Sequence, residues 1–294
     1  MRCDLHVHSY YSGRVNQPVL RHLGHESYSR PEVIYETAKR RGMDLVTVSD
    51  HDSIEGALLL AGRSDFFISE EVTCVLPSLP GERARSLHLG VIGISEKQHE
   101  EIAARRTDAE RLVSFLDEER IVWCVNHLFS PITGRLRPEE VDFALRSTRI
   151  LETRNSMMPP ATNEFAAREA VKRGLGTVGG SDAHAVPSVA RACTVVDGAT
   201  TREEFLDGIR AGRARAEGGH GSALLVTRDV VTNFALGYLH NFTNAHRSGA
   251  HALRALGLVA LLPFLPLLPL AVGLVHLQEA RGSLDTYARF SASS

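Results

Sequence analysis

The chain has 294 residues, 43% of them hydrophobic, and its 33 Lys and Arg against 35 Asp and Glu give a net charge of −2. At about 150 residues per domain, this length predicts two domains or one large α/β domain. The composition excludes a largely disordered, collagenous or disulfide-scaffold protein. The near-neutral charge provides no strong field for nucleic acid, so we expect no stable nucleic-acid complex.

The cysteines and the first residues predict the compartment. Cys3, Cys74, Cys124 and Cys193 lie far apart without a CxxC motif, and no basic and apolar leader opens the sequence. Such spacing is typical of reduced thiols. We therefore expect a cytoplasmic protein.

Strand-like and helix-like stretches alternate along the chain. A short strand at 2–5 comes first, then a helix at 29–41, where Ser29 and Glu32 form a capping-box pattern and Gly42 suits the end. Next we expect a buried strand at 45–48 and a helix at 54–61. Further strands are expected at 66–68, 87–94, 121–125, 149–151 and 176–178, and further helices at 96–116, 138–145, 161–173 and 201–211. Repeated βα units predict a parallel sheet, open or closed into a barrel.

The character changes after residue 215, where we expect a helical C-terminal extension at 216–294, including an amphipathic helix at 234–242. Residues 255–275 contain no charge and would span about 31 Å as a straight helix, enough for a bilayer core. Pro263, Pro266 and Pro269 interrupt such a helix. This apolar, Pro-rich segment is consistent with a membrane-inserted or re-entrant segment, with a tail that packs on itself or on a second copy, or with disorder.

Several polar motifs have ordinary explanations when each is taken alone. His6 and His8 after the first strand point to one side and could share an ion, although an HxH pair is often surface polarity. Residues 50–52 could form a turn with a helix cap, and the pair 70–71 could simply be solvated. His88 and His127 could be satisfied histidines, and Asp182 and His184 repeat the HxH geometry.

Together these motifs predict metal binding, because most of them follow a predicted strand, at the edge where α/β folds build active sites. Six of the 14 histidines and several carboxylates fall there. One tetrahedral zinc cannot use so many donors. The mixture of imidazole and carboxylate suggests two or three divalent Mn, Fe or Zn ions.

These blocks resemble the polymerase and histidinol phosphatase (PHP) family of metal-dependent phosphoesterases. The matching blocks, in the family's order over residues 1–215, are Asp4-Leu5-His6-Val7-His8-Ser9, Ser49-Asp50-His51-Asp52, Glu70-Glu71-Val72-Thr73, His88, Asn126-His127 and Gly180-Ser181-Asp182-Ala183-His184. The resemblance implies a distorted (β/α)7 barrel with a di- or trinuclear metal site. The ligands it implies are His6, His8, His51, Glu71, His88, His127, Asp182 and His184.

One position departs from the family's pattern. Many members carry an Asp or His soon after the first block, whereas here Ser12 is followed by Gly13 and Arg14. This departure leaves the third ion open. As a hypothesis, Arg14 binds a phosphate oxygen of the substrate instead.

The implied activity is phosphomonoesterase activity on a small phosphorylated metabolite or nucleotide, using a metal-activated hydroxide. In this hypothesis Asp50 orients a ligand histidine, and His184 or a metal-bound water protonates the leaving group. An amidohydrolase is an alternative, but its carboxylated-lysine form is disfavoured because Lys39, Lys97 and Lys172 fall within predicted helices. A non-catalytic metal-binding or interaction barrel is the other alternative. The oligomeric state stays open, as does membrane contact through residues 255–275.

Overall fold

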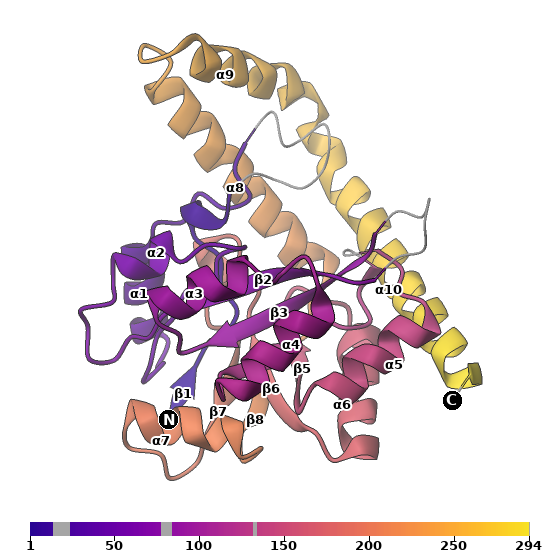
Figure 1. Cartoon of the computed structure of the whole chain (residues 1–294). Helices are drawn as coiled ribbons and strands as arrows, with labels where there is room; N and C mark the ends of the chain where they lie inside the picture. The colour runs from indigo at the N-terminus through magenta and orange to yellow at the C-terminus, as the bar shows by residue number, and fades with distance from the viewer. Residues whose placement is uncertain (14–23, 78–83, 132–133, 294) are drawn as a thin grey trace.

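The computed structural model describes residues 1–13, 24–77, 84–131 and 134–293. The fold is mixed α/β, as expected, with helices packed around two sheets (Figure 1). Its strands are β1 (Arg2–Cys3), β2 (Ser69–Val75), β3 (Ser86–Ile92), β4 (Val122–Val125), β5 (Ile150–Asn155), β6 (Gly176–Gly180), β7 (Ala192–Val195) and β8 (Arg215–Gly218).

The two sheets differ in size and direction. The larger has the order β2-β3-β4-β5-β6, antiparallel from β2 to β4 and parallel from β4 to β6. The smaller has the order β1-β7-β8 and is antiparallel. The expectation of an all-parallel sheet is therefore wrong, because β2 returns directly into β3 as an antiparallel pair.

The strands of the described residues do not form a closed ladder, so the (β/α)7 barrel is not confirmed. The expected strand at 45–48 contributes only an isolated parallel bridge between Val46 and Phe66. Two more isolated bridges join Val7 to Ala183 and His51 to Glu71. These bridges bring the chain after β1 beside both edges of the larger sheet.

The helices mostly follow the sequence, with one interruption. The expected helix at 96–116 is two helices, because Asp108 accepts a hydrogen bond from the backbone of Arg111 and starts a new one. The expected capping box of Ser29 and Glu32 is wrong, because α1 begins after Arg30 and has no side-chain cap. Thr201 and Glu204 do form a capping box at the start of the late helix. The helices are α1 (Pro31–Arg40), α2 (Glu55–Leu58), α3 (Glu96–Ala103), α4 (Ala109–Glu118), α5 (Pro138–Ser147), α6 (Pro160–Arg173) and α7 (Arg202–Arg210).

The C-terminal extension is a helical arm made of α8 (Ala223–Thr243), α9 (Gly249–Leu261), the 3₁₀ segment η5 (Leu262–Leu267) and α10 (Leu268–Ser293). It rises from the sheets along α8 and returns along α10, with α9 farthest away (Figure 1). Pro263 and Pro266 lie in η5 and Pro269 is the second residue of α10. A 3₁₀ segment has three residues per turn, so prolines spaced by three align on one side, where all three are exposed.

The second half of α10 packs on the body of the protein. Tyr287 stacks on Phe165 of α6 with ring centroids 4.2 Å apart, and Phe290 is only 2% exposed within the main core. The Ser283 hydroxyl lies 2.7 Å from that of Thr162. The chain end is thus anchored in the same core as β3 and β4.

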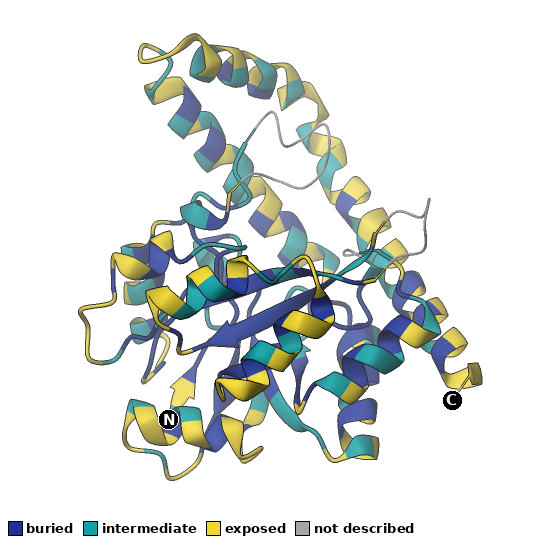
Figure 2. Ribbon diagram, in the orientation of Figure 1, coloured by how far each residue is buried: buried dark blue, intermediate teal, exposed yellow. Residues whose placement is uncertain are grey.

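The middle of the arm, by contrast, is exposed and apolar (Figure 2). The helical stretch Gly249–Ser293 contains an 18-residue window with mean hydropathy 2.5, of which 11% is buried. By length and composition it could cross a membrane.

Candidate metal centre

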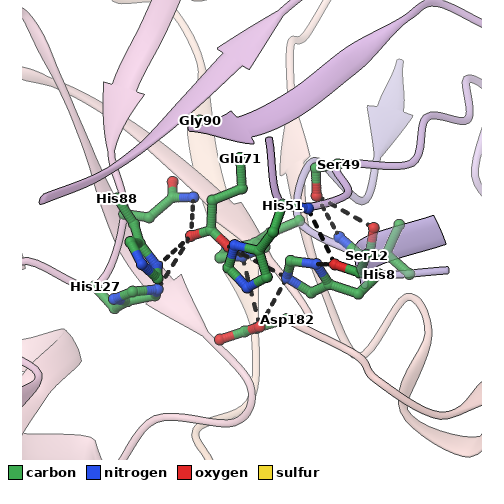
Figure 3. Close-up of polar contacts among 12 residues, drawn as sticks. His8, Ser12, Ser49, His51, Glu71, His88, Gly90, His127 and Asp182 are labelled. Atoms are coloured by element: carbon green, nitrogen blue, oxygen red, sulfur yellow. Dashed lines mark hydrogen bonds and ion pairs between the residues drawn. The ribbon is translucent and has the colours of Figure 1, made fainter. Parts of the chain in front are cut away.

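One buried carboxylate, that of Glu71 on β2, lies at the centre of the site (Figure 3). Its Oε2 is 3.2 Å from His6 Nε2, 3.4 Å from His8 Nε2 and 3.2 Å from His51 Nδ1. Its Oε1 is 3.2 Å from His88 Nδ1 and from His127 Nε2. Five of the histidines expected as ligands therefore surround one carboxylate.

A second carboxylate, Asp182, closes the other side. Its Oδ1 is 3.5 Å from His6 Nε2, 3.3 Å from His8 Nε2 and 3.6 Å from His184 Nδ1. All eight residues implied as ligands thus lie together. They form four groups whose donor atoms lie within 4.8 Å of one another: His8, His51 and His184; His6, His8 and Glu71; His6, His127 and Asp182; His51, Glu71 and His88.

Glu26 is a site residue that the sequence reasoning missed. Its Oε2 lies 3.6 Å from His51 Nε2 and its Oε1 lies 3.6 Å from His184 Nε2. It is the one acidic residue between Ser9 and Pro31, and this is the feature of the sequence that could have identified it. This position makes Glu26 a candidate for the carboxylate that the first block lacks.

The side chains of Glu26, His51 and His184 are 19%, 13% and 23% exposed, whereas the other candidate ligands are at most 8% exposed. This trio therefore forms the mouth of the centre.

Two glycines make room for these side chains. A Cβ on Gly90 of β3 would lie 2.9 Å from Asn126 Oδ1, whose amide nitrogen donates to Glu71 Oε1 at 2.9 Å. A Cβ on Gly180 would lie 2.2 Å from His6 Cβ. Any larger residue at either position would displace a ligand or its support.

One candidate ligand lies elsewhere than expected. Glu71 lies within β2 (Ser69–Val75) rather than after a strand at 66–68, whereas His88 lies within β3, in agreement with the strand expected at 87–94. His127 and Asp182 have positive φ values of 29° and 53°. That conformation is costly for residues other than glycine and is typical of functional sites.

Supporting residues fix the rings of the first two histidines. His6 Nδ1 is 2.8 Å from Glu152 Oε1, and the Oε2 of Glu152 accepts from the backbone of His127 at 3.0 Å. His8 Nδ1 is 2.9 Å from Ser12 Oγ, which also accepts from the backbone of His51. These contacts occupy the Nδ1 atoms and leave each Nε2 aimed at the centre.

The role expected for Asp50 needs correction. Its two carboxylate oxygens accept hydrogen bonds from the backbone and hydroxyl of Ser9, both at 2.6 Å, rather than from a ligand histidine. Burial raises its pKa to about 6, and the side chain is 1% exposed. Asp50 therefore holds the turn after His8. The phosphate-binding prediction for Arg14 lies outside the described residues.

The charges in the centre are strongly perturbed. Burial lowers the pKa of His8 to about 4 and that of His51 to about 3, so both rings are neutral at pH 7 and can offer an electron pair to a metal ion. Burial also opposes protonation of His184, but Glu26 outweighs it and raises the pKa to about 9. For Glu71, the surrounding histidines overcome burial and hold the pKa well below its usual range.

The donor set fits divalent cations. His6 Nε2, His8 Nε2, His51 Nδ1 and His88 Nδ1 are buried, and among the described residues none makes a hydrogen bond, although each faces a carboxylate oxygen. Buried polar atoms without partners are rare unless a ligand satisfies them. Imidazole and carboxylate together suit Mn, Fe or Zn.

Glu70 and the three lysines lie outside the centre. Glu70 faces away from Glu71 and lies 2.9 Å from His99 Nδ1 on α3. Lys39 pairs with Asp65, and Lys97 and Lys172 lie in α3 and α6. All three lysines are described, and none reaches the centre, which removes the support for a carboxylated-lysine amidohydrolase.

The comparisons with known proteins agree with this geometry. The model of a PHP-associated family matches residues 160–214. No curated protein matches the chain. Among solved structures, PsfC from Pseudomonas syringae has a TM-score of 0.54 and 17% identity over 81% of this chain and 98% of that one.

Two further structures are similar at lower scores. A protein from Bifidobacterium adolescentis described as a metal-dependent phosphoesterase has a TM-score of 0.44 and 15% identity, over 71% of this chain and 96% of its own. The lesion-specific endonuclease PfuEndoQ from Pyrococcus furiosus has a TM-score of 0.48 and 19% identity, over 74% of this chain and 58% of its own. The sequence blocks that resemble the PHP family are gathered by the fold into one centre, and a PHP-associated family model matches residues 160–214, so the chain is similar to PHP-family proteins in these parts.

Proposed function

We propose that the protein is a phosphomonoesterase that acts on a small phosphorylated metabolite or nucleotide. The observation that carries this proposal is the arrangement around Glu71, where five histidine nitrogens lie within 3.4 Å of one carboxylate. Four of these nitrogens make no hydrogen bond among the described residues. Such a site suits two or three Mn, Fe or Zn ions. When bound, these ions would lower the pKa of water and screen the charge of the phosphate.

His184, at the mouth of the centre, was expected to have two roles, metal ligation and protonation of the leaving group. His184 Nδ1 faces the carbonyl oxygen of Asp182 at 3.0 Å, which leaves its Nε2 directed toward Glu26. Ligation and proton donation would both use that Nε2, so the two roles expected for His184 exclude each other. We favour ligation, because His51 Nε2 faces the same carboxylate.

The reaction consumes one water. A bond forms between the water oxygen and phosphorus, the ester P–O bond breaks, and the leaving alcohol takes a proton. Burial of Glu71, Asp182 and His6 keeps bulk water away from these charges, which strengthens electrostatic stabilisation of the transition state.

Phosphate release from sugar phosphates, nucleotides, histidinol phosphate and short oligonucleotides tests the proposal, with protein reconstituted in Mn, Fe or Zn. We expect metal-dependent release that disappears in His127→Ala and persists in a Glu70→Gln control, since Glu70 faces away from the centre. Hydrolysis of an amide or cyclic urea without phosphate release would support an amidohydrolase. Stoichiometric metal binding with neither activity would support a non-catalytic metal-binding barrel.

We also propose that the chain forms a distorted barrel and contacts a membrane from the cytoplasmic side. The isolated bridges from Val7 to Ala183 and from His51 to Glu71 support the barrel. The arm's apolar surface supports membrane contact. Because α10 returns to the core through Tyr287 and Phe290, a dipping hairpin fits better than a full span.

A further inference from the structure

A cavity of about 710 Å³ lies between the turn after His8 and the helical arm. Tyr10, Tyr11 and Tyr28 form one side, and Leu236 and Leu239 of α8 belong to the other. Its lining includes two charged residues, Arg30 and Glu32, which pair with each other at 3.5 Å. The cavity therefore offers mainly apolar and aromatic surface to a ligand.

Close packing of α8 builds this cavity. A Cβ on Gly237 would lie 2.8 Å from Tyr28 Cε2, so the glycine lets the helix approach the tyrosine ring. The Tyr28 ring is 5.6 Å from that of His240, the next aromatic residue of α8 in the lining. The arm and the turn after His8 thus line the cavity together.

The inner wall adjoins the metal centre. Tyr10 is two residues from His8, and its ring stacks on His25 with centroids 4.2 Å apart. His25 directly precedes Glu26, whose carboxylate faces His51 and His184 at the mouth. A group attached to a phosphate at the mouth would therefore have the cavity beside it.

The outer wall continues into the exposed apolar surface of the arm. Leu239 lines the cavity and is 56% exposed, and Phe242 in the next turn is 61% exposed. Helices α9 and α10 both pack on α8. Together with η5 between them, they expose further large apolar side chains, namely Leu253, Leu256, Leu262, Phe264, Leu267, Leu270, Leu274 and Val275. These side chains occur at almost every turn, including adjacent positions, rather than along one narrow stripe. Lipid covers such a surface better than a single partner helix does.

We propose that the cavity binds the hydrocarbon chain of the substrate, which makes the substrate a lipid phosphate monoester delivered from the membrane. The proposal rests on the proposed function and narrows its substrate class. The phosphate lies at Glu26, His51 and His184, the chain lies between Tyr10 and Leu236, and the arm connects the cavity to the bilayer. Hydrolysis releases phosphate and a long-chain alcohol.

Binding of non-hydrolysable phosphonates to the metal-loaded protein tests the inference without requiring turnover. Calorimetry compares butyl, octyl and benzyl phosphonate, which share one head group. We expect octyl phosphonate to bind at least tenfold more tightly than the other two. Leu236→Trp, which fills the cavity, and Leu239→Gln, which makes its outer wall polar, should both reduce that preference, whereas Val231→Trp on another side of α8 should retain it.

The outcomes separate this inference from the proposed function. Equal affinity for butyl and octyl phosphonate would overturn the chain-binding site, and tighter binding of benzyl phosphonate would replace it with a site for an aromatic group. A chain-length preference unchanged in both cavity variants would also overturn it. Release of phosphate from short esters alongside any of these results would leave the phosphomonoesterase intact. Chain-length-dependent binding without hydrolysis would instead refute only the phosphomonoesterase.

Discussion

Replacing Glu26 with glutamine tests the mouth of the metal centre. The substitution keeps the size of the side chain and removes the negative charge that faces His51 and His184, each at 3.6 Å. At an effective dielectric constant of about 20, a unit charge pair at that distance is attracted by about 4 to 5 kcal/mol. Since Glu26 is 19% exposed, solvent screens part of this attraction.

A loss of about half that energy, about 2 to 2.5 kcal/mol, corresponds to roughly 30-fold to 60-fold weaker binding of an ion at the mouth. Metal analysis after dialysis should therefore find one ion fewer per chain in Glu26→Gln than in the wild type. The value of kcat/KM for a phosphate ester should fall by about 100-fold to 1,000-fold, as when one stabilising group is lost from a transition state. Glu70→Gln is the matched control, because it removes a buried carboxylate outside the centre.

The same substitution has a signature in the metal-free protein. The carboxylate of Glu26 raises the pKa of His184 to about 9 against the effect of burial. Without that charge, burial should bring the pKa of His184 below its present value, which an NMR titration would detect. Unchanged metal content together with an unchanged His184 titration would refute the assignment of Glu26 to the centre.

Three further predictions concern the rest of the molecule. Phe290→Ala should destabilise the protein by about 3 to 5 kcal/mol, because Phe290 is 2% exposed in the main core, and denaturant unfolding beside the exposed Leu284→Ala should show it. His99→Gln should cost about 1 kcal/mol at pH 6 and less at pH 9, measured against the wild type by thermal unfolding. The hydrogen bond to Glu70 raises the pKa of His99, so its contribution is complete below about pH 6.5 and is lost as the pH rises through the raised value. A larger loss of stability in His99→Gln at pH 9 than at pH 6 would contradict this pH dependence. The double variant Leu256→Glu with Leu270→Glu should no longer float with anionic phospholipid vesicles, whereas the control Leu224→Glu, near the base of α8, should still float. Equal flotation of the wild type, the double variant and the control would contradict membrane contact through the arm.

The sequence predicted the members of the centre better than their positions in the fold. Local blocks such as His6-Val7-His8 carry their own spacing, so they can be recognised without knowing the sheet order. Glu26 has no such block and reaches His51 and His184 through tertiary structure alone. The same holds for Glu152, which orients His6 from a strand 146 residues away.

Neither β7, whose four residues are all buried, nor β8 was predicted from the sequence. β8 has the sequence Arg-Ala-Glu-Gly and is partly exposed, and its ladder with β7 defines it. The break between α3 and α4 was equally hidden, because it contains no Gly or Pro. There the backbone carbonyl of Arg106 accepts a hydrogen bond from the backbone of Val75 in β2, and the Arg106 side chain pairs with Asp52 at 2.7 Å. No local sequence pattern reveals these contacts.

The C-terminal extension packs on the loop that follows His127. Glu279 of α10 hydrogen-bonds with Ser130, whose backbone donates to the carbonyl of the ligand His127. A Cβ on Gly282 would lie 2.6 Å from Pro131 Cγ, so α10 packs directly on the loop that follows this ligand. A chain cut near residue 215 would remove both contacts and expose Phe165. The helix that carries the apolar surface of the arm therefore also supports a ligand, and the boundary that the change in composition suggests does not divide the structure into independent parts.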